Sequence, residues 1–432
     1  MHHETQVTDT DIYHSMSSTG ALNPDIIWLV LQHAAYSDDL WDYRTLRACC
    51  RVSHEWYPLA KRMLFRFIVL RSRQQVRILQ QTRGKHLQIG PNTHSKKQGY
   101  DVFAPEDTWE AQTRILECHW SHEFRFNDIR HTLALFPSLY EVRVRIHTCE
   151  RPRVDHDDSS IPIPSTIRAL RFTGSMIFSE EQNITSASSF ISVLSKYTRL
   201  HCLQFDRMWI TPHLQFPQLF QSIQVNELTY LELEIYDFHH MLSADLFDNL
   251  LYLILHQKAR RGPWATPQHI IGVFKRVKSL TVFYYSHVTS PQRVPQLSQL
   301  SETFPALTEL RLGIQLFHLR VSLISPLFSQ IPSGLISLSL FISAGIYIRT
   351  GLTETQPWDN FTIPPTLRYF EYGLDYSRDA ISDPSVIRPF LNACKSMGVQ
   401  ILPFRAHDII GIVCIPITLL KDYYSLACRL QK

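Results

Sequence analysis

Several side chains in this sequence have the types and spacing that bind metal ions in other proteins. The clearest group is Cys118-His119-x-x-His122, in which a thiol and two imidazoles could begin a zinc site. A tetrahedral site needs a second pair of ligands with matching spacing, and the sequence offers none. The pairs His2-His3 and His239-His240 are equally isolated. We therefore expect no metal ion, and interpret Cys118 and His119 as the edge of a strand and its loop.

The sequence also lacks four motifs that mark common catalytic sites: GxGxxG, the P-loop, GxSxG and HExxH. Only 14 Gly occur in 432 residues, which leaves little material for phosphate-cradling loops. We expect no cofactor and no enzymatic activity. An enzyme whose site is assembled from distant residues is kept as an alternative.

A group of arginines could instead bind phosphate or RNA: Arg143, Arg145, Arg151, Arg153, Arg168 and Arg171. The neighbouring Asp155, Asp157 and Asp158 would weaken their field. The net charge of +4 is mild for this length. We therefore expect no nucleic-acid partner.

The bulk composition favours a folded protein of the cytoplasm or nucleus. The hydrophobic content of 44% is ample for a core, and the 8 Cys include no CxxC pair, so we expect reduced thiols. The N-terminus has no apolar stretch of signal-peptide length, and we expect residues 1–20 to be disordered. The apolar segment 409–420 is too short to span a membrane and contains Pro416, so no membrane association is expected.

A six-residue unit, apolar-x-x-apolar-x-apolar, recurs through most of the chain at intervals of about 28 residues. Its nine copies begin at Leu139, Ile167, Leu200, Leu228, Leu250, Val277, Leu307, Leu335 and Leu367. The last two apolar positions alternate with polar ones, which is typical of a strand with one buried face.

Helical patterns lie between the strand units, at residues 190–194, 270–277 and 386–391. Strand and helix at a regular period predict an α/β fold, a solenoid in which a curved parallel sheet is lined by helices outside.

Alternation along each unit predicts which residues face the concave side of the sheet. At these predicted concave positions, arginines are frequent in the early repeats, acidic residues in the fourth repeat, and aromatic residues in the later ones. Concave Arg and aromatic side chains are the kinds that anchor partners, although an ordinary solvated face is the alternative for each one. The candidate substrate-binding residues are Arg143, Arg145, Arg171, Tyr230, Glu232, Glu234, Tyr252, Phe283, Arg311, Phe341 and Tyr369. The same face is predicted to include Glu141, Gln204, His256, Ser339 and Glu371.

Residues 22–65 predict a short helical module ahead of this array. Ile26, Ile27, Val30 and Leu31 have helical spacing, and Trp56, Leu59, Ala60, Met63 and Leu64 form an apolar stripe. Ser53 is a plausible N-cap for the last helix, and Pro58 predicts either a kink or a helix that begins close to it. From pattern alone, such helices could simply cap the solenoid, with Trp56, Leu59 and Met63 buried against its first repeat.

The identities of these residues resemble the F-box, especially that of fungal proteins. The resemblance lies in Leu22-x-Pro24-Asp25-Ile26-Ile27, in Leu46-Arg47-Ala48-Cys49-Cys50-Arg51-Val52-Ser53-x-x-Trp56, in Leu59-Ala60 and in Leu64-Phe65. It covers about one tenth of the chain. Two departures are Asn23, where the family often has Pro, and an acidic and aromatic insertion at residues 36–43.

The resemblance implies a substrate-recognition adaptor of an SCF-type ubiquitin ligase. The helices would bind a Skp1-like protein and, through it, a cullin, while the repeats would bind an unknown protein substrate. The positions implied for Skp1 contact are Leu22, Pro24, Ile27, Leu31, Leu46, Val52 and Trp56. The alternative is a non-catalytic leucine-rich-repeat scaffold whose N-terminal helices only cap the solenoid.

The repeats also resemble those paired with F-boxes, with one departure. The family often has Asn or Cys three residues after the last apolar position, where this chain has His147, Ser175, Met208, Tyr236, Lys258, Tyr285, Gln315, Ser343 and Asp375. We therefore expect irregular curvature, with loops at residues 84–100, 150–164, 286–300 and 349–361 on that side.

The predicted layout is a tail at 1–20, the helical module at 21–65, a connecting region with irregular first repeats at 66–138, the solenoid at 139–405 and a C-terminal segment at 406–432.

Overall fold

The structure is a computed structural model, and it describes residues 23–34, 36–37, 40–72, 74–79, 81, 112–120, 131–146, 164–174, 196–197, 199–206, 220, 225–236, 242–258, 270–288, 300–316, 331–344, 362–376 and 388–403. The predictions for Leu22, for the tail 1–20, for the helix at 190–194, for the loops at 84–100, 150–164 (apart from Pro164) and 349–361, and for the segment 406–432 lie outside these residues. The chain divides into two compact units, residues 1–67 and 68–432.

The first unit contains three helices in mutual contact: α1 (Pro24–Ala34), α2 (Tyr43–Cys49) and α3 (Trp56–Arg66). Its core includes Ile27, Leu31, Leu46, Ala60 and Met63, each at most 2% exposed. The insertion at 36–43 contains the antiparallel strands β1 (Tyr36–Ser37) and β2 (Leu40–Trp41), followed at once by α2. The predicted three-helix module is confirmed.

Short polar residues fix where these helices begin. The Asn23 side-chain oxygen accepts a hydrogen bond from the Asp25 N–H, and Pro24 occupies the first helical position, where no N–H is needed. The departure at Asn23 therefore has a local role as the cap of α1. Asp42 caps α2 by accepting from the Thr45 N–H at 2.9 Å.

The third helix begins two residues before its proline. Its N-cap is Glu55 and not Ser53 as predicted, although the Ser53 hydroxyl does accept a hydrogen bond from the Trp56 N–H at 3.3 Å. Pro58 falls in the first turn of α3, where backbone N–H groups have no intrahelical partner. Of the two alternatives for Pro58, the helix that begins close to it is confirmed.

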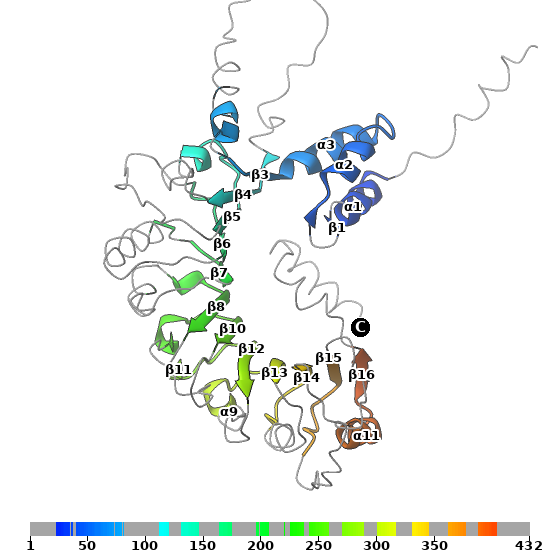
Figure 1. Cartoon of the computed structure of the whole chain (residues 1–432), viewed down its shortest axis with the longest axis vertical. Coiled ribbons are helices and arrows are strands. Elements are labelled where there is room, and N and C mark those ends of the chain that lie inside the picture. The colour runs from blue at the N-terminus through cyan, green and yellow to red at the C-terminus, as the bar shows by residue number, and fades with distance from the viewer. Residues whose placement is uncertain are drawn as a thin grey trace, which may run out of the picture. The chain divides into compact units, whose positions relative to one another are not determined.

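The second unit is built on one twelve-stranded sheet, whose strands follow one another in sequence order along a curved row (Figure 1). Every pair from β4 to β16 is parallel. The strands are β3 (Phe67–Leu70), β4 (Ile115–Trp120), β5 (Glu141–Ile146), β6 (Ala169–Gly174), β7 (Cys202–Asp206), β8 (Tyr230–Tyr236), β10 (Tyr252–Lys258), β12 (Ser279–Val288), β13 (Glu309–Leu316), β14 (Ser337–Ala344), β15 (Tyr369–Tyr376) and β16 (Gln400–Pro403). The predicted α/β solenoid with a parallel sheet is confirmed.

The nine sequence units correspond to β5, β6, β7, β8, β10, β12, β13, β14 and β15, and the register adds strands at both ends. Leu116 pairs with Val142 and Cys118 with Val144, so β4 carries the same unit, with Thr113 in its first position. In β16, Ile401 pairs with Phe370 and Pro403 with Tyr372. The first position there is Gly398, whose φ of 74° suits a residue without a side chain.

A repeated backbone contact joins neighbouring repeats where the strands begin. In each of the nine repeats from β5 to β15, two successive N–H groups donate to one carbonyl of the repeat before it; for example, Arg168 and Ala169 both donate to Tyr140. Threonine hydroxyls add further bonds between repeats, as when Thr166 donates to the Leu139 carbonyl at 2.7 Å and Thr366 to the Leu335 carbonyl at 2.7 Å. These bonds satisfy carbonyls of the turns that precede the strands.

Six of the positions where the repeat family often has Asn or Cys lie within strands: Tyr236, Lys258, Tyr285, Gln315, Ser343 and Asp375. Tyr236 pairs with Lys258, Gln315 with Ser343, and Ser343 with Asp375. At these five positions, pairing with the adjacent strand satisfies the backbone groups without an asparagine. The loop predicted at 286–300 likewise begins later, since β12 runs to Val288.

One predicted helix is wrong. Ile270 and Ile271 form the short strand β11, which pairs with β9 (Leu242–Ser243), and Gly272 follows with a φ of 86°. The apolar spacing of residues 270–277 looks helical because Phe274 and Val277 are buried in the core, at 2% and 0% exposed. They reach it from a turn and not from a helix. The pattern at 386–391 does contain a helix, α11 (Arg388–Ser396), in which Phe390 and Leu391 are buried.

Among the remaining helical elements are the short η2 (Val225–Glu227), η3 (Ala244–Leu246) and α9 (Leu300–Thr303). They precede or accompany the turns that lead into β8, β10 and β13. No described helix is long and apolar enough to cross a membrane.

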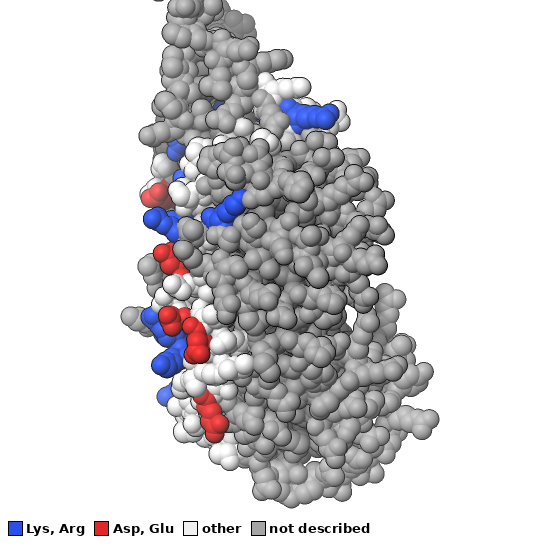
Figure 2. Space-filling model, turned by 90° about the vertical axis from the view of Figure 1, so that its left-hand side faces the viewer, with Lys and Arg blue, Asp and Glu red and all other residues white. Residues whose placement is uncertain are grey.

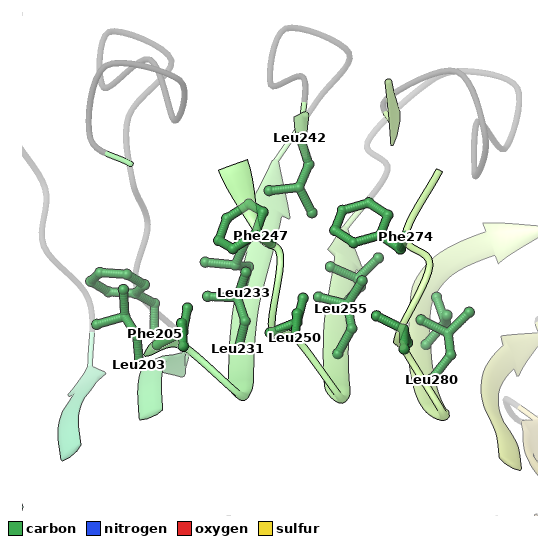
Figure 3. Close-up of a cluster of buried hydrophobic side chains, with 14 of the residues drawn as sticks. Leu203, Phe205, Leu231, Leu233, Leu242, Phe247, Leu250, Leu255, Phe274 and Leu280 are labelled. Atoms are coloured by element: carbon green, nitrogen blue, oxygen red, sulfur yellow. The ribbon is translucent and has the colours of Figure 1, made fainter. Parts of the chain in front are cut away.

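The core of the second unit is a continuous layer on one face of the sheet, filled by the apolar positions of each repeat. Figure 3 shows Leu231 and Leu233 of β8 and Leu255 of β10 pointing into the same layer as Phe247 and Phe274. Phenylalanines from successive repeats stack along it, with ring centroids of Phe247 and Phe274 6.1 Å apart and of Phe274 and Phe304 5.4 Å apart. One repeat alone could not bury these rings, so each depends on its neighbours.

Candidate functional site

Two surfaces were predicted to bind partners, and the first is the helical module. Three of its predicted contact residues, Ile27, Leu31 and Leu46, are 1%, 0% and 0% exposed. They pack the helices against each other, so a partner could not touch them unless the module opened. Their burial gives no support to partner contact at these three positions, which stays a prediction. Pro24 is exposed, Val52 is 61% exposed and Trp56 is half-buried.

A different set of apolar side chains on α1 is exposed to solvent. Ile26, Leu29 and Val30 are 49%, 55% and 45% exposed, and their spacing of three and four places them on one helical face. This exposed stripe of α1 lies away from the buried pair Ile27 and Leu31, so the helix is apolar on two sides. Elsewhere in the module Tyr57 is 49% exposed. Sequence spacing alone could not say which apolar side is buried.

The second predicted surface is the sheet face opposite the core, which we call the concave face. The alternation is confirmed, because Val142, Val144, Leu170, Phe172, Leu231 and Leu233 belong to the core cluster, whereas Ala169 and Cys202 are buried outside it. The predicted concave residues fall into lateral rows. In the middle row, Glu117 pairs with Arg143, Arg143 with Arg171, Arg171 with Gln204, and Gln204 with Glu232.

Much of this row is closed to solvent. Arg171 is 3% exposed and Gln204 and Glu232 are 0% exposed, so Arg171 and Glu232 are not available as surface anchors. Their burial gives no support to substrate contact at these two residues, which stays a prediction. The physical reason is that each side chain is covered by polar neighbours from adjacent strands, about 4.8 Å away. Arg145, near the end of β5, is accessible to solvent, because its side chain is 46% exposed.

Buried charges on this face are paired with one another. The Arg143 Nε donates to Glu141 Oε1 at 2.7 Å, and the Arg171 Nε lies 2.8 Å from the same oxygen. Glu141 is 0% exposed. Burial is the largest single effect and would lower the pKa of Arg171, but the charges of Glu141 and of the more distant Cys202, Tyr230 and Glu232 together outweigh it. The pKa is therefore raised, and this arginine stays charged.

A second cluster joins β8 and β10. Glu232 Oε2 accepts from the Tyr230 hydroxyl at 2.8 Å, and Glu232 Oε1 lies 2.8 Å from His256 Nε2. Burial and the nearby Glu232 charge raise the pKa of Tyr230 well above its usual value, so the phenol is kept as a hydrogen-bond donor. A Tyr–Glu–His set resembles catalytic groupings, yet Glu232 is fully buried and offers no surface for a substrate.

Glu117 and His119 form a third contact, in β4. Glu117 Oε1 lies 2.9 Å from His119 Nε2 and 3.7 Å from Arg145 Nε. Burial would raise the pKa of Glu117, but the His119 hydrogen bond and the Arg145 and Arg143 charges overcome this and lower it. The sequence prediction missed Glu117 because β4 has Thr113 in place of the first apolar residue. Accepting a buried Thr there would have revealed the strand.

The other candidates lie further along the sheet. Tyr252, Arg311, Phe341 and Tyr369 are half-buried on the concave face, and Ser339 donates to Glu371 Oε2 at 2.8 Å. Glu234 and Phe283 lie in β8 and β12, with side chains outside the described part of the structure.

No metal site is assembled by the residues that the structure describes, where no three His, Cys, Asp or Glu side chains converge. Cys118 and His119 point to opposite faces of β4: Cys118 lies in the core, and His119 contacts Glu117 on the concave face. Burial raises the pKa of the Cys118 and Cys202 thiols far above neutral pH, which excludes them as thiolate nucleophiles. His122 lies outside the described residues.

On the face in view in Figure 2, the described charges do not gather into a patch of one sign. Figure 2 shows Lys and Arg interspersed with Asp and Glu along the described strip of the face in view. Such mixing is not the basic stripe by which nucleic-acid-binding surfaces are recognised.

Comparison with known proteins gives no assignment: no protein-family model matches the chain, and no curated protein matches it significantly.

Proposed function

We propose that this protein is a substrate-recognition adaptor of an SCF-type ubiquitin ligase, in which the helical module binds a Skp1-like protein and the repeats bind a protein substrate. The chain itself would supply no chemistry. Its part would be to raise the effective concentration of the substrate near the ubiquitin-transferring enzyme, as linkage of two binding modules does.

The observation that carries the proposal is the exposed stripe of α1, Ile26, Leu29 and Val30. Three large aliphatic side chains about half exposed on one helical face cost free energy in water, and such patches mark partner sites. The stripe falls inside the segment whose ordered residues resemble the F-box. Val52 and Tyr57 add exposed apolar area on the same module.

Co-purification with a Skp1-like protein tests the proposal. Leu29→Glu places a charge in the centre of the stripe, and we expect retention to fall at least about tenfold. The matched control is Ile271→Glu, which puts the same charge at an apolar residue 47% exposed in the other unit and should leave retention unchanged. Absence of Skp1 binding by the unaltered chain would overturn the proposal.

The alternative scaffold makes a different prediction for the same variant. If α1 only capped the repeats, Leu29→Glu would weaken the cap and lower the thermal stability of the repeat unit. If α1 binds a partner, the variant should fold as stably as the wild type and lose only that partner.

A further inference from the structure

The short helix α2 presents three arginines on one side. Arg44, Arg47 and Arg51 follow one another at spacings of three and four residues, and each is exposed. The helical path continues to Arg51, because Cys50 keeps a right-handed helical backbone and the Arg51 N–H is bonded within the last turn. At about 100° per residue, the three arginines lie within about 60° of the helix circumference, on the side away from the buried Leu46. We call them the arginine stripe of α2.

The arginine stripe has no partner within the described part of the chain, where its side chains form no hydrogen bond and no ion pair. The described carboxylates of the helical module are those of Asp25, Asp42 and Glu55, and the side chains of Asp38 and Asp39 lie outside the described residues. Both Asp42 oxygens accept hydrogen bonds from Thr45, which lower the pKa of Asp42 most; the Arg44 charge lowers it further, without an ion pair. The remaining described Lys and Arg of the module, Lys61, Arg62 and Arg66, belong to α3 and have contacts of their own.

This arrangement destabilises α2 locally. Like charges at spacings of three and four residues repel each other on a helix. Arg44 lies in the first turn, where the helix dipole favours an acidic residue, and the first turn of α2 contains none. Arg47 and Arg51 lie toward the C-terminal end, where the dipole favours cations, but this does not relieve their mutual repulsion. A local cost of this kind on an exposed surface is typical of a functional surface.

The number and spacing of the arginines decide which kind of partner fits. Anionic membranes are bound by clusters of about four to eight Lys and Arg, and nucleic acids through about six to ten phosphate contacts, so three arginines are too few for either. Each guanidinium fork matches a carboxylate through paired hydrogen bonds. Because the arginines leave the helix about 5–6 Å apart, they fit carboxylates that repeat along a protein segment.

We infer that the arginine stripe of α2 binds an acidic segment of a partner protein, through Asp or Glu carboxylates that repeat at about one helical turn. The arginine stripe shares no residue with the exposed stripe of α1, so this interaction adds a second partner surface to the helical module and goes beyond the adaptor function. The competing occupant is the chain's own acidic segment at residues 1–20, which contains Glu4, Asp9 and Asp11.

The test is fluorescence anisotropy with the full-length protein and a labelled helical peptide that carries Glu at spacings of three and four residues. The same peptide with Lys in place of Glu, vesicles that contain phosphatidylserine, and a single-stranded RNA serve as the other probes. We expect the Glu peptide to bind and the other probes not to bind. Binding should weaken as salt rises from about 50 mM to about 500 mM, because the contact is exposed and screened.

Replacing the whole stripe with glutamine should weaken binding of the Glu peptide about tenfold, because each exposed ion pair contributes a factor of about two. The variant combines Arg44→Gln, Arg47→Gln and Arg51→Gln. Glutamine has nearly the helix propensity of arginine, so α2 should stay folded, which thermal unfolding checks. The matched control removes three exposed cations from the turn before β12 and should bind as the wild type does: Lys275→Gln, Arg276→Gln and Lys278→Gln.

Equal affinity of the wild type and the stripe variant would overturn the inference, as would tighter binding of the vesicles or the RNA. Replacing the tail acids by amides should leave the affinity unchanged: Glu4→Gln, Asp9→Asn and Asp11→Asn. A gain of about tenfold in that variant would show that the tail occupies the stripe, which would also overturn the inference. Leu29→Glu should lose the Skp1-like protein and keep the Glu peptide, so that either proposal can fail without the other.

Discussion

The carboxylate of Glu232 on β8 lies 2.8 Å from the imidazole of His256 on β10, although the two residues are 24 positions apart in the chain. Both are buried, and the contact crosses diagonally between adjacent strands, because Glu232 itself pairs with Ile254. Polar contacts of this kind join the repeats on the side of the sheet away from the core.

We predict that Glu232→Ala destabilises the repeat unit by about 3 kcal/mol, because it removes a buried carboxylate that accepts from the half-buried Tyr230 hydroxyl and contacts the buried His256 imidazole. Urea unfolding followed by circular dichroism measures the change. Glu302→Ala, at an exposed glutamate of α9, should alter stability by no more than about 0.5 kcal/mol. Equal effects of the two substitutions would contradict a structural role for the buried contact.

Phe274 should be among the most sensitive core positions. It is 2% exposed and stacks between Phe247 and Phe304, so Phe274→Ala should cost about 4 kcal/mol through lost contacts and a cavity. Phe274→Leu retains much of the volume and should cost about 1.5 kcal/mol. The comparison is made by chemical denaturation. A smaller loss for Ala than for Leu would show that the aromatic stack does not hold neighbouring repeats together.

Two threonines in equivalent turns should respond differently to loss of the hydroxyl. Thr366 donates to the Leu335 carbonyl at 2.7 Å, so Thr366→Val should cost about 1 kcal/mol. Thr308 donates at 3.2 Å to the Lys278 carbonyl, which already accepts two backbone N–H groups. Thr308→Val should therefore lower the free energy of unfolding by about a few tenths of a kcal/mol, because only a weak hydrogen bond is lost. Hydrogen exchange of the turn amides distinguishes the two variants.

Thiol reactivity should follow burial. Burial raises the pKa of Cys394 to about 12 and that of Cys118 and Cys202 further, whereas Cys49 and Cys50 are half-buried and their pKa values are raised less. Since the thiolate is the reactive form, a raised pKa lowers the reactive fraction, and labelling should accelerate about tenfold per pH unit below the pKa. Among the described cysteines, maleimide labelling with peptide mass spectrometry should modify Cys49 and Cys50 before Cys118, Cys202 and Cys394. Rapid labelling of native Cys202 would refute this.

The sequence predicted the repeats because their signal is local. A strand that buries one face needs alternating apolar residues. This alternation identified nine strands of the twelve-stranded sheet, between β5 and β15, and the face on which Arg143, Gln204 and Glu232 lie. The helical module was predicted for the same reason, from the spacing of Ile27, Leu31, Ala60 and Met63. Strands β4 and β16 were not predicted from the sequence, because Thr113 and Gly398 replace the first apolar residue of the unit.

By itself, then, the sequence determined the class of fold, the repeat period and the side of each strand on which a residue lies, since each depends on neighbours within a few positions. Tertiary structure alone decided which of those residues meet solvent. Whether Glu232 is buried and Arg145 exposed depends on side chains brought alongside from other repeats, and whether Ile27 or Ile26 faces the helical core depends on α3. Contacts between distant segments leave no periodic trace in the chain, so only the assembled sheet and helices reveal them.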